Sequence, residues 1–308
     1  MEFLIVGPGA MGCLFAARLK KAGHHVTLLD HMEERADLIN KQGIKIEGIL
    51  GEYTVSVPTV TGQLSGFPDV AVVCVKANET KQAAEDIEPL IGQKAYVLTL
   101  QNGLGNVAVL QEVFGKDRVL GGVTAEGATL LGHGHVKHAG QGETKFGSDV
   151  SLGNVLSEIV SAFNDAGFDT RSANNVNSLI WGKLIVNVGI NALTAITRLK
   201  NGRLPDIEGT RLIMEHVVKE AVDVADAKCV ELPYPDPLGR VVEVCRATSG
   251  NIASMLQDVL KQGTTEIAFI NGAIVREGQA LGIPTPVNHT LTSLIQAIQD
   301  TYRERVRE

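Results

Sequence analysis

The chain has 308 residues, which is long for one ordinary domain and sufficient for two. Hydrophobic residues make up 44% and charged residues 20%, so a large core can be buried and gross disorder is disfavoured. Only 4% of the residues are aromatic while 33 are glycine, which favours an α/β architecture over an all-β sandwich. The net charge of −7 argues against a nucleic-acid-binding protein, although a few lysines could still form a site for a small anion.

The four cysteines lie far apart in the sequence and form no C-x-x-C pair. This spacing argues against a disulfide framework or a zinc site and favours a reducing, cytoplasmic location. No signal peptide is predicted, and the most apolar stretch, residues 184–196, is interrupted by two asparagines. His133, His135 and His138 lie close together, but a strand pattern divides them between two faces or places them near a turn. We therefore expect no membrane partner, no nucleic-acid partner and no metal.

The first half of the chain alternates short apolar runs with helical patterns. The predicted strands cover residues 2–6, 24–30, 70–76 and 94–103. The predicted helices cover residues 10–22, 31–43, 79–91 and 151–167. Residues 44–57 are predicted to form a hairpin that turns near Gly48–Gly51, and residues 127–147 an antiparallel extension of the sheet. Such strand–helix alternation predicts a Rossmann-type domain, which is a doubly wound and mostly parallel sheet.

The second half has almost no strand signal. Its helical patterns cover residues 177–197, 210–228, 241–263, 266–282 and 284–306. The polar stretch at 168–175 is the candidate junction between the two halves. We therefore predict a dinucleotide-binding domain at residues 1–172 and an all-helical substrate-binding domain at residues 173–308.

A glycine-rich loop joins the first predicted strand to the first predicted helix. Its sequence fits G-x-G-x-x-G and reads Gly7-Pro8-Gly9-Ala10-Met11-Gly12. Gly7 would allow a tight turn, Gly9 would let the backbone approach a pyrophosphate, and Gly12 would let helix and strand pack closely. Asp30 ends the next predicted strand, where such folds place an acidic residue. This context favours dinucleotide binding over a glycine-rich turn that binds nothing.

Two further polar residues follow predicted strands. Lys76 comes after the run VAVVCV and Asn102 after YVLTLQ. Open α/β sheets bind ligands beyond the carboxyl ends of their strands, so both side chains are candidates to meet cofactor and substrate. A solvated lysine and an ordinary Asn-Gly turn are the alternatives at these two positions.

A polar face is predicted on the first helix of the second half. Lys183, Asn187 and Asn191 follow one another at intervals of four residues and so share one side of a helix whose other residues are mostly apolar. A buried lysine and buried amides need partners, which either an internal polar network or a polar ligand would supply. An ammonium in a partly apolar environment has a lowered pKa, which suits an acid or base.

Three polar residues nearer the C-terminus are weaker candidates. Asn251 and Ser254 are three residues apart and could bind a carboxylate or hydroxyl, although Asn251 could instead cap a helix. Glu266 follows two threonines and could simply belong to the first turn of a helix.

These features together resemble the ketopantoate reductase (2-dehydropantoate 2-reductase) family over essentially the whole chain. The strings that carry the resemblance are GPGAMG at 7–12, VKAN at 75–78, QNGLG at 101–105, WGKLIVNVGINALTAI at 181–196, KNG at 200–202, GNIASMLQDV at 250–259 and TEIAFING at 265–272. The resemblance implies an active site in the cleft between a Rossmann domain and a helical domain.

The resemblance also implies roles for single residues. Lys183 matches the catalytic acid, and Glu266 would orient or balance it. The substrate-contacting positions match Asn187, Asn191, Asn201, Asn251 and Ser254. The positions that line the cofactor and the reacting centre match Lys76, Asn102 and Glu266. Ala128 matches a backbone contact to the cofactor, near an apparent one-residue insertion.

One departure from the family concerns the choice of cofactor. The family commonly has an arginine just after the second strand, where it meets the 2′-phosphate of NADPH, whereas this strand ends in Asp30-His31. A carboxylate there would accept hydrogen bonds from a ribose 2′-hydroxyl and repel a 2′-phosphate. No arginine stands at 31–34 to offset it, and Arg35 is a helical turn further on. Alternatively, Asp30 could turn to its own backbone as a helix cap. NADPH is the expectation from the family, and NADH is the expectation from Asp30.

The sequence therefore predicts a cytoplasmic NAD(P)H-dependent oxidoreductase of pantothenate biosynthesis that reduces 2-dehydropantoate to (R)-pantoate. Its partner would be this small-molecule substrate, with a homodimer as the candidate assembly. Two alternatives are a two-domain dehydrogenase for another 2-keto acid and a dinucleotide-binding sensor without catalysis. The polar helix face with Lys183 argues against the sensor.

Overall fold

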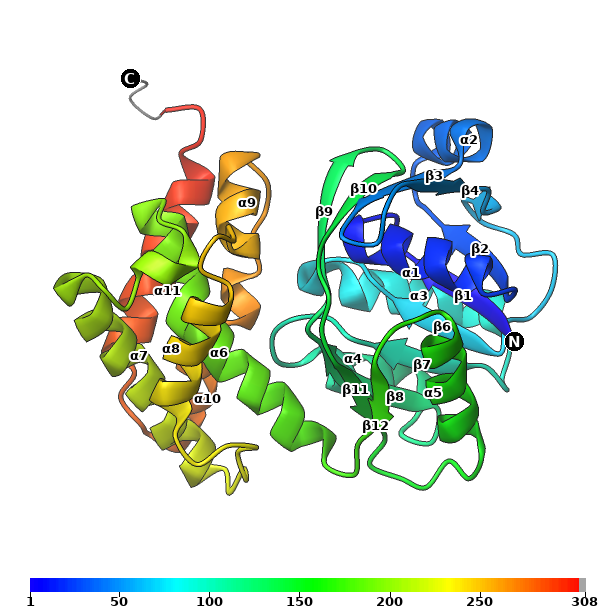
Figure 1. Cartoon of the computed structure of the whole chain (residues 1–308). Coiled ribbons are helices and arrows are strands. Elements are labelled where there is room, and N and C mark those ends of the chain that lie inside the picture. The colour runs from blue at the N-terminus through cyan, green and yellow to red at the C-terminus, as the bar shows by residue number, and fades with distance from the viewer. Residues whose placement is uncertain (305–308) are drawn as a thin grey trace. The chain divides into compact units, whose positions relative to one another are not determined.

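The computed structural model describes residues 1–304, and the chain divides into two compact units. Unit 1 comprises residues 1–101 and 105–176. Unit 2 comprises residues 102–104 and the described residues from 177 onward. Figure 1 shows strands and helices together in unit 1 and helices in unit 2, as the sequence predicts.

The main sheet of unit 1 has eight strands in the order β12-β11-β8-β7-β6-β1-β2-β5. Their bounds are β1 Glu2–Val6, β2 His25–Leu29, β5 Thr59–Val60, β6 Val70–Val73, β7 Tyr96–Thr99, β8 Val119–Thr124, β11 Thr144–Gly147 and β12 Thr170–Ser172. Every neighbouring pair is parallel except β8 and β11. β1 pairs with β2 on one side and β6 on the other, so the chain winds in both directions from β1. The predicted doubly wound, mostly parallel sheet is confirmed.

Helices cover both faces of this sheet, which explains why its central strands are continuous apolar runs. In β1, Phe3 and Ile5 join a core with α1 and α5, while Leu4 and Val6 join a core with α3 and α4. The helices of unit 1 are α1 Ala10–Lys21, α2 Glu33–Gln42, α3 Thr80–Ile91, preceded by the 3₁₀ turn η1 Ala77–Glu79, α4 Asn106–Phe114 and α5 Val155–Asp165. The loops between β1 and α1 and between β6 and α3 lie at the carboxyl ends of adjacent strands.

A second sheet of unit 1 corrects one expectation. The predicted hairpin forms β3 Ile44–Gly48 and β4 Tyr53–Val55, which pair antiparallel. Residues 127–140 form β9 Gly127–Gly132 and β10 His135–Gly140, also antiparallel, but β10 pairs with β3 in a four-stranded sheet of its own. Only β11 extends the main sheet antiparallel. Alternation along a strand specifies which side chains face inward, but it does not specify the partner strand.

Unit 2 is helical throughout the residues that the structure describes. Its helices are α6 Val176–Thr197, α7 Glu208–Ala227, α8 Pro237–Ala247, α9 Ser254–Leu260, α10 Asn271–Leu281 and α11 Pro286–Asp300, with 3₁₀ turns η2 Asn201–Arg203 and η3 Ile267–Phe269. The pattern at 241–263 is therefore two helices, separated by the polar segment around Gly250. The pattern at 284–306 ends as a helix at Asp300, and its last two residues lie outside the described part.

Helix α6 is the apolar centre of unit 2. Trp181, Leu184, Ile185 and Val188 are almost fully buried in the core of this unit. By length and composition alone, α6 is long and apolar enough to cross a membrane, but most of it is buried inside the protein. Burial in a protein core gives the same composition as a membrane span does.

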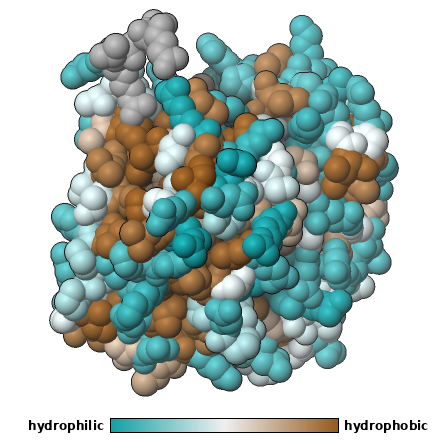
Figure 2. Space-filling view, turned by 60° about the vertical axis from the view of Figure 1, so that its left-hand side comes forward, coloured by the Kyte–Doolittle hydropathy of each residue, from teal (hydrophilic) through white to brown (hydrophobic). Residues whose placement is uncertain are grey.

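Some large apolar side chains are exposed on unit 2, among them Leu212, Leu260 and Leu294. The space-filling view in Figure 2 shows apolar side chains interspersed with polar ones on the face that it draws. Single exposed apolar residues are usual on protein surfaces, so they do not identify an interface. A homodimer remains a prediction.

A buried polar network joins the helices of unit 2. Glu220 of α7 accepts hydrogen bonds from the backbone N–H groups of Val287 and Asn288, both at 2.9 Å, and from the Asn288 side chain at 2.7 Å. Asn288 in turn accepts from Asn271 of α10 at 3.0 Å, and Asn271 also donates to the Val188 carbonyl of α6. Glu220 thereby satisfies N–H groups at the start of α11 that have no partner within that helix.

We predict that Glu220→Ala destabilises the protein by about 2–4 kcal/mol, because it leaves buried donors without an acceptor. Thermal unfolding would show this as a Tm lower by roughly 2–4 °C for each kcal/mol. Glu215→Ala on the same helix is the matched control, since the Glu215 side chain is 39% exposed and forms a surface ion pair with Arg211. It should change stability by less than about 0.5 kcal/mol. Equal Tm values for the two variants would contradict the capping role.

Candidate active site

The predicted glycine loop is a tight turn between β1 and α1. Gly7 has a φ of +101°, which side chains other than glycine rarely adopt, and its N–H donates to the Leu29 carbonyl at 3.0 Å. A Cβ on Gly12 would lie 2.0 Å from the Gly7 carbonyl oxygen. The first turn of α1 therefore packs directly against the loop, as the sequence predicts.

The N-terminus of α1 suits an anionic ligand. No side chain caps this helix at Gly9, and its first turn contains no acidic residue. A Cβ on Gly9 would meet nothing closer than the Cys74 carbonyl at 3.9 Å, so the space beside the loop is open. Backbone N–H groups at an uncapped helix start, beside an open glycine, fit the pyrophosphate of a dinucleotide.

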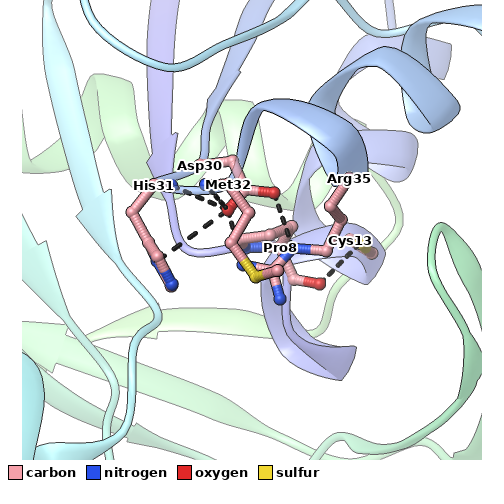
Figure 3. A network of polar contacts seen from close by, with 6 residues as sticks. All are labelled: Pro8, Cys13, Asp30, His31, Met32 and Arg35. Carbon is pink, nitrogen blue, oxygen red and sulfur yellow. Dashed lines mark hydrogen bonds and ion pairs between the residues drawn. The ribbon is translucent and has the colours of Figure 1, made fainter.

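Asp30 is engaged by its own neighbours. Its carboxylate accepts hydrogen bonds from the backbone N–H groups of His31 at 2.7 Å and Met32 at 3.0 Å (Figure 3). It also accepts two from Arg35, at 2.6 Å from Nε and 2.5 Å from Nη2. The side chain of Asp30 has no exposed surface, whereas that of His31 is 74% exposed. The expectation that no arginine offsets Asp30 is therefore wrong, because Arg35 reaches back across the first turn of α2.

Asp30 and Arg35 each shift the pKa of the other toward its charged form. Burial alone would raise the pKa of Asp30, but hydrogen bonds from Arg35, Met32 and His31 together lower it. The hydrogen bond to Asp30 likewise raises the pKa of Arg35. Asp30 is thus a neutralised anion with both oxygens occupied, and the guanidinium beside it is 18% exposed. The sequence analysis discounted Arg35 as lying a helical turn too far, because a separation of five residues fits no familiar helix pairing.

Two other sequence candidates lie in unit 1. Lys76 is half-buried at the start of η1, just after the strand that pairs with β1. Gln101 donates to the Val75 carbonyl at 2.7 Å and to the Thr80 hydroxyl at 2.9 Å, and it thereby holds the chain on either side of Lys76. Ala128 lies on β9, opposite His138 of β10, and packs against the same core as α1.

The histidines of β10 face in different directions. His135 is half-buried and lies 2.7 Å from Glu47, whereas His138 is buried and lies 2.6 Å from Glu126. Each ring therefore has a different carboxylate partner.

In unit 2, the predicted polar face of α6 is present. Lys183, Asn187 and Asn191 all lie within one uninterrupted helix, with Lys183 and Asn187 half-buried and Asn191 buried. Burial lowers the pKa of Lys183 to about 8, and attraction to Glu266 opposes part of that effect. Lys183 can therefore both hold and release a proton near neutral pH.

Glu266 and Asn102 are also neighbours. Glu266 is 8% exposed and accepts a hydrogen bond from the Asn102 side chain at 3.3 Å. The short segment after β7 that holds Asn102 belongs to unit 2, because the Leu104 N–H donates to the Phe269 carbonyl at 2.9 Å. Asn102 is therefore more than an ordinary turn residue. Glu266 thus accepts a hydrogen bond from the Asn102 amide, and its carboxylate also attracts the Lys183 ammonium.

Three buried amide atoms of unit 2 have no hydrogen-bond partner among the described residues. They are Nδ2 of Asn191, Oδ1 of Asn201 and Oδ1 of Asn271. Buried polar atoms are nearly always paired, so each calls for a polar group that the described residues do not supply. Asn191 and Asn201 are among the residues that the family resemblance predicts to contact the substrate, whereas Asn271 belongs to the buried network of unit 2.

Asn251 and Ser254 are exposed on unit 2, around the start of α9. The residue that caps α9 is Ala253, and no side chain makes a capping hydrogen bond there. The alternative that Asn251 caps this helix is therefore wrong. The Asn251 carbonyl instead accepts from the Asn201 N–H at 3.2 Å, so the two predicted substrate residues lie on adjoining loops.

Known proteins resemble both halves of the chain. The sequence pattern of the family described as ketopantoate reductase PanE/ApbA matches residues 3–150, and the pattern of its C-terminal domain matches residues 175–299. A 2-dehydropantoate 2-reductase of Halobacterium salinarum is 35% identical over 305 residues, covering 97% of this chain and 99% of that protein. The corresponding protein of Pyrococcus horikoshii is 33% identical, with coverage of 96% and 97%.

Solved structures show the same fold. A PanE/ApbA family ketopantoate reductase from Ralstonia eutropha superposes with a TM-score of 0.90 at 33% identity, covering 99% of this chain and all of that one. D-mandelate dehydrogenase with NADH and anilino(oxo)acetate gives a TM-score of 0.91 at 27% identity, with coverage of 98% and 100%. Family patterns over both halves and full-length relatives above 30% identity thus agree, and the chain belongs to the ketopantoate reductase family of dinucleotide-binding oxidoreductases.

Proposed function

We propose that this chain reduces 2-dehydropantoate to (R)-pantoate, the reductive step of pantothenate synthesis. The observation that carries the proposal is Lys183, an amine with a pKa of about 8 on the polar face of the central helix of unit 2. The family relatives are named for this reaction, which supports the substrate. When bound at the glycine loop, the nicotinamide dinucleotide supplies the hydride.

We assign proton transfer and substrate binding to residues of unit 2. Lys183 in its ammonium form stabilises the developing alkoxide and then donates a proton to it. Glu266, buried and negatively charged, favours that ammonium form, and Asn102 holds one Glu266 oxygen by a hydrogen bond. The substrate-contacting residues of this proposal are Asn187, Asn191, Asn201, Asn251 and Ser254.

A second candidate is a reductase for another 2-keto acid. The likeness to D-mandelate dehydrogenase favours it, since that structure holds an oxoacetate ligand with NADH. The two candidates share the role of Lys183 and differ in the substrate side chain that unit 2 accepts. Parallel assays with 2-dehydropantoate and with aryl 2-keto acids separate them. A dinucleotide sensor without catalysis is disfavoured by the amine of Lys183.

We propose NADPH as the cofactor, with Arg35 as the cation that meets its 2′-phosphate. Both oxygens of Asp30 are occupied by Arg35 and by backbone N–H groups, so Asp30 is poorly placed to accept a ribose 2′-hydroxyl. Its negative charge is also neutralised, which removes the main reason to expect repulsion of a phosphate. Arg35 thus takes the part that the family commonly gives to an arginine just after the second strand.

We predict that Lys183→Ala lowers kcat by about 10²–10⁴ while the fold stays intact. The wild-type kcat/KM should fall as pH rises through about 8, because the ammonium donor is present below that pKa and lost above it. Lys183→Arg is the informative control, since an arginine keeps the charge but does not release its proton. If Lys183→Arg retained full kcat, proton donation by this residue would be refuted.

We expect Asn251→Ala and Ser254→Ala to raise KM for the keto acid and to leave kcat nearly unchanged, because neither side chain transfers a proton in this scheme. Both residues are exposed, so the substitutions should not affect stability. Steady-state kinetics measure the effect, with the keto acid varied at saturating cofactor and then the cofactor varied at saturating keto acid. A change in cofactor KM alone would argue against substrate contact.

For the cofactor, we predict that Arg35→Ala lowers kcat/KM for NADPH about tenfold to a hundredfold, because one charge-assisted contact is lost. The kcat/KM for NADH should change far less. Calorimetric Kd values for NADP⁺ and NAD⁺ provide a readout that is independent of turnover. Arg35→Lys should be intermediate. Equal losses for both cofactors would show that Arg35 serves only to order α2 and would leave Asp30 as the determinant.

A further inference from the structure

Asn201 has a side chain that is fixed at one end and buried without a partner at the other. It begins η2 and is 7% exposed. Its Nδ2 donates to the Thr248 hydroxyl at 2.9 Å, while its Oδ1 has no partner in the described part of the chain. The backbone N–H groups of Asn201 and Gly202 also donate to the carbonyls of Asn251 and Ser249, so the two loops are held together.

Thr248 decides which way the Asn201 amide points. The single proton of its hydroxyl is donated to the Val244 carbonyl at 2.7 Å, within the last turn of α8. A carbonyl can only accept, so the hydroxyl oxygen of Thr248 has only acceptor capacity left. The Asn201 group beside it must therefore be the NH₂ group.

The remaining atom of the amide, Oδ1 of Asn201, is then always an acceptor. A ligand that pairs with it must offer a hydrogen-bond donor. At neutral pH the carboxylate and the ketone of 2-dehydropantoate are acceptors only, and its C4 hydroxyl is the one donor in the molecule. An aryl 2-keto acid with an unsubstituted ring offers no donor at all.

We propose that Thr248 is a positioning residue that fixes Asn201 as an acceptor and thereby selects keto acids that carry a hydroxyl. This inference rests on the proposed function, because it takes Asn201 as a substrate contact. It goes further by assigning the C4 hydroxyl to Oδ1 of Asn201 and the selectivity to a residue that does not touch the substrate.

The test compares two substrates that differ by one oxygen atom. 2-Dehydropantoate is 4-hydroxy-3,3-dimethyl-2-oxobutanoate, and 3,3-dimethyl-2-oxobutanoate lacks only the hydroxyl. The measured quantity is the ratio of their kcat/KM values in the wild type, Thr248→Val and Thr248→Ser. Valine keeps the shape but removes the acceptor, so the Asn201 amide is free to turn. Serine keeps the hydroxyl and loses only a methyl group.

We expect the wild type to favour 2-dehydropantoate strongly, since a site that is built to bind a hydroxyl rejects the analogue without it. Thr248→Val should lower the ratio about tenfold, the effect of one hydrogen bond, mainly through KM for 2-dehydropantoate. Kinetic constants for the deoxy analogue should hardly change. Thr248→Ser should keep the wild-type ratio, and Thr248→Ala should behave like the valine variant if valine disturbs folding.

An unchanged ratio in both Thr248→Val and Thr248→Ala would overturn the inference and leave the proposed function standing. A serine variant as impaired as the valine variant would also overturn it, because the threonine methyl group would then be what matters. A wild-type enzyme that reduces neither compound would overturn the proposed function, and the inference with it.

Discussion

The arrangement of unit 2 depends on one helix that is apolar on most sides and polar along a single line. Helix α6 buries Trp181, Leu184 and Val188 in the core, while Lys183 and two asparagines lie at intervals of four residues along one of its faces. Close packing makes this possible: a Cβ on Gly189 would lie 2.7 Å from a Val241 methyl group of α8. The low pKa of Lys183 follows from the same packing, because a helix at the centre of a core leaves little water for an ammonium.

Asp30 in unit 1 and Lys183 in unit 2 are charged groups whose pKa values are lowered by different causes. In unit 1, hydrogen bonds from Arg35 and from two backbone N–H groups lower the pKa of Asp30, which forms an ion pair with Arg35. In unit 2, Glu266 influences Lys183 through its field, while the hydrogen bond to one of its oxygens comes from Asn102. Paired charges are suited to building a fixed binding surface. A lysine whose proton is loosely held is suited to chemistry.

Periodicity and local spacing were sufficient to predict most of the fold and part of the site. A sequence pattern can predict the strand at 2–6, the glycine loop and the helix face with Lys183 and Asn191. Each of these depends on residues that are close together in the sequence. The Gly-rich strand β8 was not predicted, because Gly121 and Gly122 weaken a strand signal, yet a Cβ on Gly122 would lie 2.1 Å from the Lys145 carbonyl of β11. No spacing rule predicts the contact of Arg35 with Asp30, the contact of Thr248 with Asn201 or the pairing of β10 with β3. These contacts form only in the folded chain.

The segment 102–104 has a consequence for recombination between related genes. The chain leaves unit 1 after residue 101, contributes Asn102 and Leu104 to unit 2, returns at residue 105 and leaves again after 176. An exchange of halves at residue 176 would therefore join the Glu266 of one parent to the Asn102 of the other. Chimaeras of this family should be compatible only when both parents agree at three residues far upstream of the crossover. Three crossings also tie the units together, so a single proteolytic cut in the 105–176 part would not release unit 2 from unit 1.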